Sequence, residues 1–250
     1  MRSMKTTAVC AGGRRADPDA DEDLISSEGA LSMLQNLGID PASVAVLPLS
    51  YYLDSPALGQ FARAAYVDGW LRLGVGAGAS TKDEVLAQQR AAVSSVMESF
   101  AADGPVVPPY ASRGAPLLKK GLYTTVYEYT FVFARSEGQK NLGVSTCPPA
   151  NAALELALTF WDLLLPHAPV FDADGQRAAR GEPSFSPTQF DLWKRFLTEA
   201  SGLRVISKDT WNQFLEFMHE IDPDFAKHDF EAAWPSVIDE FVDWVHSQRT

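Results

Sequence analysis

Three successive segments toward the C-terminus place aromatic and aliphatic residues every three to four positions, between residues that typically begin and end helices. They read "SPTQFDLWKRFLTEASG", "SKDTWNQFLEFMHEID" and "WPSVIDEFVDWV". This spacing gathers the apolar side chains on one face of a helix, and that face must be buried against another element. The chain is therefore constrained to fold as packed amphipathic helices.

The residues at the starts of these segments are typical helix caps. Ser186, Pro187 and Gln189 form a capping-box pattern with proline at the first helical position, and Ser207 is placed to cap the next helix. Pro235 suits the start of the last helix, where the absence of an N–H costs nothing. The side chains predicted to face inward are Phe190, Trp193, Phe196, Leu197, Trp211, Phe214, Leu215, Met218, Ile221, Trp234, Ile238, Phe241 and Val245.

Similar patterns predict helices in the rest of the chain. In the first of them, Leu31, Leu34 and Leu37 recur at helical spacing before Gly38, and Asp40 and Pro41 then look like the start of a second helix. The aromatic run from 123 to 133 has the composition of a strand but the spacing of a helix, and we favour the helix. Helices are expected over residues 31–37, 41–53 with a kink or a shortening at Pro48, 66–74 after an extended piece around Phe61, 80–100, 123–133 and 155–165.

These elements predict a single compact all-α domain of EF-hand-like helical pairs. The domain is expected over residues 24–246, after a disordered tail at 1–23, with loop insertions near 101–118, 145–154 and 166–187. The calcium-binding pattern is missing, because "DSPALGQ" offers only Asp54 and "DADG" at 172–175 has no correctly placed Glu. No metal site is expected.

The charge of the chain favours a basic protein as partner. The formal net charge is −11, which argues against nucleic acid or an anionic membrane. Residues 205–250 hold ten acidic and three basic residues, so that the C-terminal part carries most of this charge. "GVGAGAS" at 74–80 follows a helix rather than a strand, so a flexible linker is favoured over a phosphate loop.

The two cysteines indicate a reducing compartment. Cys10 and Cys147 form no disulfide framework, no apolar run approaches the ~18 residues of a membrane span, and the N-terminus lacks the apolar core of a signal peptide. A faint likeness of the N-terminus to a transit peptide is the weaker alternative. We expect a cytoplasmic or nuclear protein.

The sequence offers little for catalysis. The four histidines form no HxxxH or HExxH pair, and no Cys/His cluster has zinc spacing. A thiol–imidazole pair of Cys147 and His167 is the one enzymatic alternative. We therefore expect a binding module without a cofactor rather than an enzyme.

Six segments together resemble the defective-in-cullin-neddylation family, which carries the potentiating-neddylation domain. They are "LGIDPASVAVL", "YTFVFARSEGQKNL", "ALTFWDLLL", "FDLWKRFL", "ISKDTWNQFLEF" and "AAWPSVIDEFVDWV", and they occur in the family's order. The resemblance implies a scaffold-type co-ligase that binds the cullin C-terminal winged-helix region and the neddylation conjugating enzyme, beside the RING ligase of a cullin–RING ligase complex. A calcium-independent EF-hand-like adaptor with an unrelated partner is the alternative.

The resemblance implies a cullin-binding patch at Asp209, Ala233 and Asp239. Exposed carboxylates can form charge-assisted hydrogen bonds with Lys or Arg of a partner, and a small side chain at 233 allows close approach to the backbone. Taken alone, Asp209 could simply stabilise a helix N-terminus, while Asp239 and Asp243 could form an ordinary solvated face.

The resemblance also implies an apolar pocket for the acetylated N-terminal methionine of the conjugating enzyme. Acetylation removes the terminal charge, so that this group can be buried. The alternative is that the residues concerned are ordinary core residues. The chain departs from the family here through Pro48, the polar Ser50 and the apparent insertion at 145–154. The aligned positions are Val46, Leu49, Ser50, Leu53, Phe61, Phe133 and Leu163.

Overall fold

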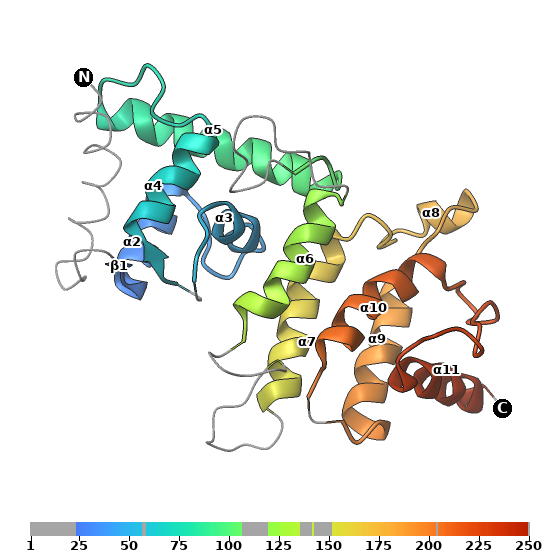
Figure 1. Cartoon of the computed structure of the whole chain (residues 1–250). Coiled ribbons are helices and arrows are strands. Elements are labelled where there is room, and N and C mark those ends of the chain that lie inside the picture. The colour runs from blue at the N-terminus through green and yellow to red at the C-terminus, as the bar shows by residue number, and fades with distance from the viewer. Residues whose placement is uncertain are drawn as a thin grey trace. The chain divides into compact units, whose positions relative to one another are not determined.

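Helices make up most of the chain in a computed structural model, whose described residues are 24–56, 59–106, 120–135, 142, 152–203 and 205–249 (Figure 1). Within these ranges, strand structure is limited to one short antiparallel pair. The all-α class predicted from the sequence is confirmed. The predicted tail at 1–23 and both cysteines lie outside the described residues.

The chain divides into two units, residues 1–133 and 134–250. The extent of a single domain over 24–246 stays a prediction. Within the described ranges, every helix is too short or too polar to cross a membrane, and the cytoplasmic or nuclear location stays a prediction as well.

The first unit contains two short strands and five helices among its described residues. β1 and β2 pair antiparallel, with Leu24 opposite Ala62 and Ile25 opposite Phe61. The extended piece expected around Phe61 is thus β2. The elements are β1 (Leu24–Ile25), α2 (Ser27–Leu37), α3 (Val46–Tyr52), β2 (Phe61–Ala62), α4 (Arg63–Arg72), α5 (Lys82–Ala101) and α6 (Leu122–Phe133).

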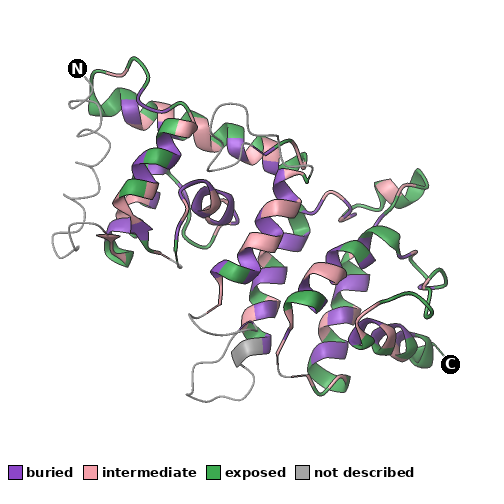
Figure 2. Cartoon of the chain, in the orientation of Figure 1, coloured by how far each residue is buried: buried purple, intermediate pink, exposed green. Residues whose placement is uncertain are grey.

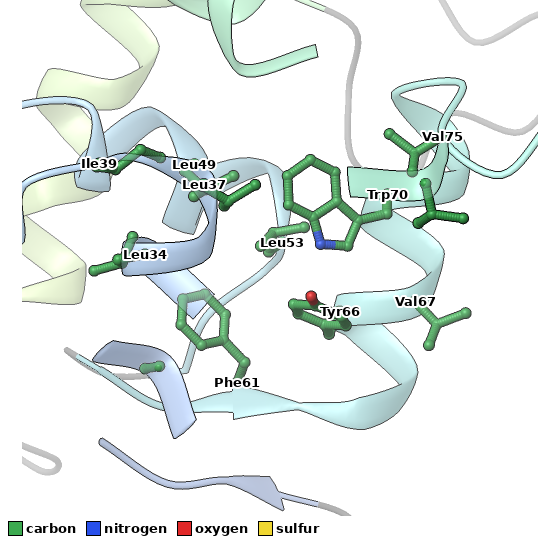
Figure 3. Close-up of a cluster of buried hydrophobic side chains, with 12 residues drawn as sticks. Leu34, Leu37, Ile39, Leu49, Leu53, Phe61, Tyr66, Val67, Trp70 and Val75 are labelled. Carbon is green, nitrogen blue, oxygen red and sulfur yellow. The ribbon is translucent and has the colours of Figure 1, made fainter. Parts of the chain in front are cut away.

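The core of the first unit forms where α2, α3 and α4 turn their apolar faces toward one another (Figure 3). Trp70 is fully buried there, beside Tyr66 and Leu53. Leu34 and Leu37 point into this core as their spacing predicted, but Leu31 is 47% exposed. The inward face of α2 is therefore narrower than the leucine spacing indicated.

The helix predicted from Pro41 begins only at Val46. The Asp40 side chain accepts a hydrogen bond from the Ala42 N–H (2.9 Å), and this local bond holds the chain in a turn instead of capping a helix. Pro48 consequently falls in the first turn of α3, where a backbone N–H has no partner inside the helix. The helix is therefore shortened, as predicted, and it is shortened at its N-terminal end.

The glycine-rich segment at 74–80 is fastened to α5 rather than free. The Gln88 side chain accepts a hydrogen bond from the Gly76 N–H (2.7 Å) and donates one to the Ala77 carbonyl (3.0 Å). Val75, just before Gly76, is buried in the core. The prediction of a flexible linker is wrong, because one side chain of the following helix satisfies the loop's backbone.

The second unit holds the three segments with which the sequence pattern began. Both expected caps are present, since Ser186 and Gln189 form a capping box and Ser207 accepts a hydrogen bond from the Thr210 N–H. The helices are α7 (Ala152–Leu164), a 3-10 turn (Leu165–His167), α8 (Gln176–Ala179), α9 (Pro187–Arg195) continued by a π-helical turn (Phe196–Ala200), α10 (Lys208–Glu220) and α11 (Ser236–Gln248).

Two of the predicted insertions contain regular structure. α7 already begins at Ala152, inside the span 145–154, and the rest of that span lies outside the described residues. The span 166–187 holds α8 and is closed by a bridge between Phe171 and Phe185. The span 166–187 is therefore more ordered than its Pro and Gly content indicated.

Aromatic side chains form the core of the second unit. Trp161 stacks on Trp211 with ring centroids 5.0 Å apart, and Trp193 stacks on Phe214 at 4.5 Å. Phe241 of α11 meets Trp193 of α9 edge-on at 5.0 Å, so Trp193 touches both α10 and α11. Buried positions alternate with exposed ones along these three helices (Figure 2). Such ring pairs stabilise a core beyond the area that they bury. The three C-terminal helices are thereby held as one body.

Candidate functional site: an acidic surface on α10 and α11

The first carboxylate of the predicted patch stands at the start of α10. Asp209 is exposed in the first helical turn, two residues after the capping Ser207. The cap fixes this turn, because the Thr210 N–H donates to Ser207 Oγ at 3.0 Å. Asp209 also lies in the first turn of the helix, where the helix dipole favours a negative charge. Both a docking role and a local stabilising role are compatible with this position.

The second carboxylate stands in the first turn of α11 and already has a partner within the protein. Asp239 Oδ1 lies 2.7 Å from Nε2 of His228, and the Asp239 side chain is 30% exposed. A carboxylate can only accept here, so the imidazole N–H donates. Asp239 is therefore held in one orientation and is not the freely exposed carboxylate that the sequence suggested.

The imidazole of His228 is buried under aromatic rings. Its side chain is 1% exposed, and its centroid lies 5.8 Å from the ring of Phe217 and 6.0 Å from that of Trp234. Trp234 is half-buried and precedes α11. It therefore packs the loop, rather than α11, against Phe217 of α10. Ala233, beside it, is exposed.

Asp239 thus binds the buried histidine, Ala233 lies next to Trp234 in the same loop, and Asp209 lies farther along α10. The ring of Phe217 on α10 meets Phe241 on α11 at 6.1 Å, so the two helices pack directly. Asp209 is eight residues before Phe217, which is about 12 Å along the helix axis. All three predicted residues belong to the second unit, with Asp209 on α10, Asp239 on α11 and Ala233 in the loop before α11. Their role stays a prediction.

The residues predicted for the conjugating-enzyme pocket lie mostly in the core of the first unit. Leu49, Leu53 and Phe61 are buried members of the cluster in Figure 3, and Val46 packs against it partly exposed. A hollow of about 180 Å³ in this unit has other walls, among them Tyr52, Arg72, Leu73, Ser95 and Val96. The pocket stays a prediction.

The other pocket positions differ in character. Phe133 ends α6 and is buried, and Leu163 on α7 is half-buried in the second unit. Ser50 on α3 is 1% exposed, and its hydroxyl has no hydrogen-bond partner among the described residues. A buried polar atom without a partner is costly, so Ser50 is the one position here whose chemistry the core does not explain.

The carboxylates of the acidic turn at 172–175 accept hydrogen bonds from backbone N–H groups of the residues that follow. The carboxylate of Asp172 accepts hydrogen bonds from the N–H groups of Arg177 (3.1 Å) and Ala178 (2.9 Å), and Asp174 accepts one from Gln176. Burial raises the pKa of Asp172, but these hydrogen bonds outweigh it and lower the pKa below its usual value. The two carboxylates cap the short helix α8.

Three relatives cover nearly the whole chain. The chain is 44% identical to "Defective in cullin neddylation protein 1" of Mycosarcoma maydis over 92% of its own length and 67% of that protein. It is 30% identical to the protein of the same name from Cryptococcus neoformans over 93% of its own length and 73% of that protein. It is 27% identical to human "DCN1-like protein 3" over 92% of its own length and 60% of that protein. The family model described as "Cullin binding" matches residues 112–244.

The chain belongs to the defective-in-cullin-neddylation family. The resemblance predicted from the six segments is thereby confirmed. The matched region of this family includes Asp209, Ala233 and Asp239, together with the loop that holds His228.

Sequence reasoning missed His228. The histidines were considered only for metal spacing and for a thiol pair, whereas His228 pairs with a carboxylate eleven residues later in the chain. It lies in an irregular loop between α10 and α11, where no helical or strand periodicity relates the two positions. No pattern in the amino-acid sequence of this chain predicts that His228 pairs with Asp239.

Proposed function

We propose that this chain promotes cullin neddylation as a non-catalytic scaffold, and that it docks a cullin through the acidic surface of α10 and α11. One observation carries the proposal. The cullin-binding family model covers the part of the chain in which Asp209 and Asp239 stand on two packed helices, with Ala233 in the loop that joins them. The partner surface is the C-terminal winged-helix region of a cullin.

The chemistry of the surface fits a basic partner. Asp209 and Asp239 each stand in the first turn of a helix, where the backbone holds the side chain's base in place. Carboxylates fixed in this way form charge-assisted hydrogen bonds with Lys or Arg at little cost in side-chain freedom. The excess of acidic residues over 205–250 also accelerates encounter with a positively charged surface.

The second half of the proposal is that the chain also binds the neddylation conjugating enzyme. Val46, Leu49, Ser50, Leu53, Phe61, Phe133 and Leu163 would receive its acetylated N-terminal methionine. Apolar side chains suit the methionine, and the unpartnered hydroxyl of Ser50 offers one polar contact for an amide. For the buried residues, binding requires a local opening of the core.

A scaffold of this kind raises a rate without a catalytic group. Holding the conjugating enzyme and the cullin on one chain replaces a collision in solution by an oriented approach of thioester and acceptor lysine. The chemistry stays with the conjugating enzyme and the RING ligase. The protein contributes orientation and local concentration.

A reconstituted neddylation reaction tests the proposal. The initial rate of cullin modification is measured with the wild-type chain, with Asp209→Lys/Asp239→Lys, and without the chain. We expect the wild type to raise the rate and the double variant to leave it at the rate without the chain. Acceleration by the double variant equal to that of the wild type would refute docking through this surface.

The same reaction separates the thiol-enzyme alternative. Cys147→Ser should leave the acceleration unchanged, because no step of the scaffold mechanism uses a thiol of this chain. A complete loss of acceleration in this variant, with cullin binding intact, would favour the enzyme.

A peptide titration tests the second half by itself. N-terminal peptides of the conjugating enzyme, acetylated and unacetylated, are titrated against the full chain. We expect the acetylated peptide to bind at least about tenfold more tightly, because an uncompensated terminal charge resists burial. Equal affinities would remove the methionine pocket from the proposal and leave the cullin dock standing.

A further inference from the structure

Phe230 is an exposed aromatic residue in the loop between α10 and α11. Its 46% exposure makes it one of the few large apolar side chains that face solvent in the described part of the chain. The others recorded there, Leu31, Leu71 and Val132, belong to the first unit. A single exposed apolar residue is ordinary by itself, so its surroundings decide whether it means anything.

The surroundings of Phe230 are those of Asp239. The ring of Phe230 meets the imidazole of His228 edge-on, with centroids 4.6 Å apart and planes at 89°. The same imidazole binds Asp239 through Nε2 at 2.7 Å. The exposed aromatic ring and the partly exposed carboxylate therefore both contact the same imidazole.

The loop that carries Phe230 is held by its own hydrogen bonds. Asp229 Oδ1 accepts one from the Glu231 N–H (2.9 Å), and the Asp229 carbonyl accepts one from the Ala232 N–H (3.2 Å). The Ala232 carbonyl in turn accepts one from Trp234 (2.9 Å). Little freedom is left to lose when a partner covers the ring, which favours binding.

We propose that Phe230 is an apolar anchor of the cullin-docking surface, set beside Asp239 by the buried ring of His228. This inference rests on the proposed function and adds a contact that the three predicted residues do not include. Interfaces are held mainly by a few central aromatic side chains, surrounded by polar groups that fix register. Ala233, exposed in the same loop, carries a small side chain that lets a partner's backbone approach.

Charge decides the occupant. The acids that flank or lie near the ring, Asp229, Glu231 and Asp239, select a surface that presents Lys or Arg beside an aliphatic side chain. The match of this loop to the cullin-binding family model points to the cullin as the protein that supplies it. A second acidic copy of this chain would meet repulsion at the same place.

The test is the affinity of the full chain for the purified C-terminal region of a cullin. We expect Phe230→Ala to weaken binding at least about tenfold, as truncation of a central aromatic anchor does. Phe230→Leu should recover most of the affinity, since it keeps an apolar side chain over His228. Leu31→Ala and Leu71→Ala are matched controls, because those side chains are 47% and 51% exposed in the first unit, and they should stay within about twofold of the wild type.

Salt separates the apolar contact from the charges. Phe230→Ala should leave the salt dependence of the affinity unchanged, whereas Asp239→Asn should reduce it. Wild-type affinity in Phe230→Ala, with binding lost in Asp209→Lys/Asp239→Lys, overturns the anchor and leaves the dock intact. Absence of binding by the wild type overturns the proposed function, and the anchor with it.

Discussion

His228 determines where the Asp239 carboxylate lies. The sequence placed Asp239 correctly in the first turn of the last helix but could not assign it a partner, because the pair is formed by tertiary packing across an irregular loop. Three rings, Phe217, Phe230 and Trp234, surround the imidazole. At the scale of single residues, local position was predictable from the sequence and side-chain partners were not.

Ser50 gives a prediction at the same scale. Its buried hydroxyl has no partner among the described residues, and an unsatisfied hydroxyl costs about 1–3 kcal/mol. We expect Ser50→Ala to raise the free energy of unfolding by about 1 kcal/mol, after the loss of some packing. Urea denaturation followed by circular dichroism measures the change.

Ser55→Ala is the matched control for Ser50→Ala. Ser55 is also buried in the first unit, but its hydroxyl donates to the Gln60 carbonyl. The same substitution there should lower the free energy of unfolding by about 1 kcal/mol, because the hydrogen bond to the Gln60 carbonyl is lost. A similar loss in both variants would show that Ser50 has a partner after all.

Helix caps and apolar stripes were the most predictable features at the scale of elements. Ser186, Gln189 and Ser207 cap α9 and α10 as expected, because capping depends on residues only three positions apart. The helix predicted over residues 41–45 is wrong, because Asp40 can either cap a helix or accept a hydrogen bond in a turn, and the sequence does not distinguish the two. Ile238 is buried on α11, as the predicted inward face requires. Trp234, predicted for the same face, lies in the loop before the helix.

The two serine caps provide a matched pair of variants. Ser186→Ala and Ser207→Ala each remove one cap, and each should cost about 1 kcal/mol of stability. Ser207→Ala also frays the turn that carries Asp209, so we expect it alone to weaken cullin binding, about threefold to tenfold. Calorimetric titration with the purified cullin region measures the affinity of each variant. Equal affinities in the two variants would show that the order of this turn does not matter for docking.

At the scale of the whole molecule, aromatic residues are distributed unevenly between the two units. All seven tyrosines precede residue 134, whereas five of the six tryptophans follow it. Burial, with Tyr52 and Asp54 nearby, raises the pKa of Tyr51 to about 12. Burial raises the pKa values of Tyr123 and Tyr129 further. The first unit therefore holds several tyrosine side chains that must stay neutral for the unit to remain folded.

Alkaline pH should consequently weaken the first unit selectively. A phenol whose pKa is raised on folding contributes stability that is fully present below its ordinary pKa of about 10 and is lost as the pH rises toward the folded value. In Trp70→Phe, all remaining tryptophans report on the second unit. We expect tyrosinate absorbance to rise at a lower pH than the tryptophan fluorescence shift. Coincident transitions would show that the two units unfold together.

The central claim is that carboxylates on α10 and α11 dock a cullin. The decisive measurement is the dissociation constant for a purified cullin C-terminal region, compared between Asp209→Lys/Asp239→Lys and the control Asp83→Lys/Glu98→Lys. The control makes the same change in net charge on exposed residues of α5, and Asp83, like Asp209, stands in a first helical turn. We predict a loss of at least about 100-fold in the first pair and less than about threefold in the control. Equal losses in both pairs, or wild-type affinity in the first, would contradict docking through this surface.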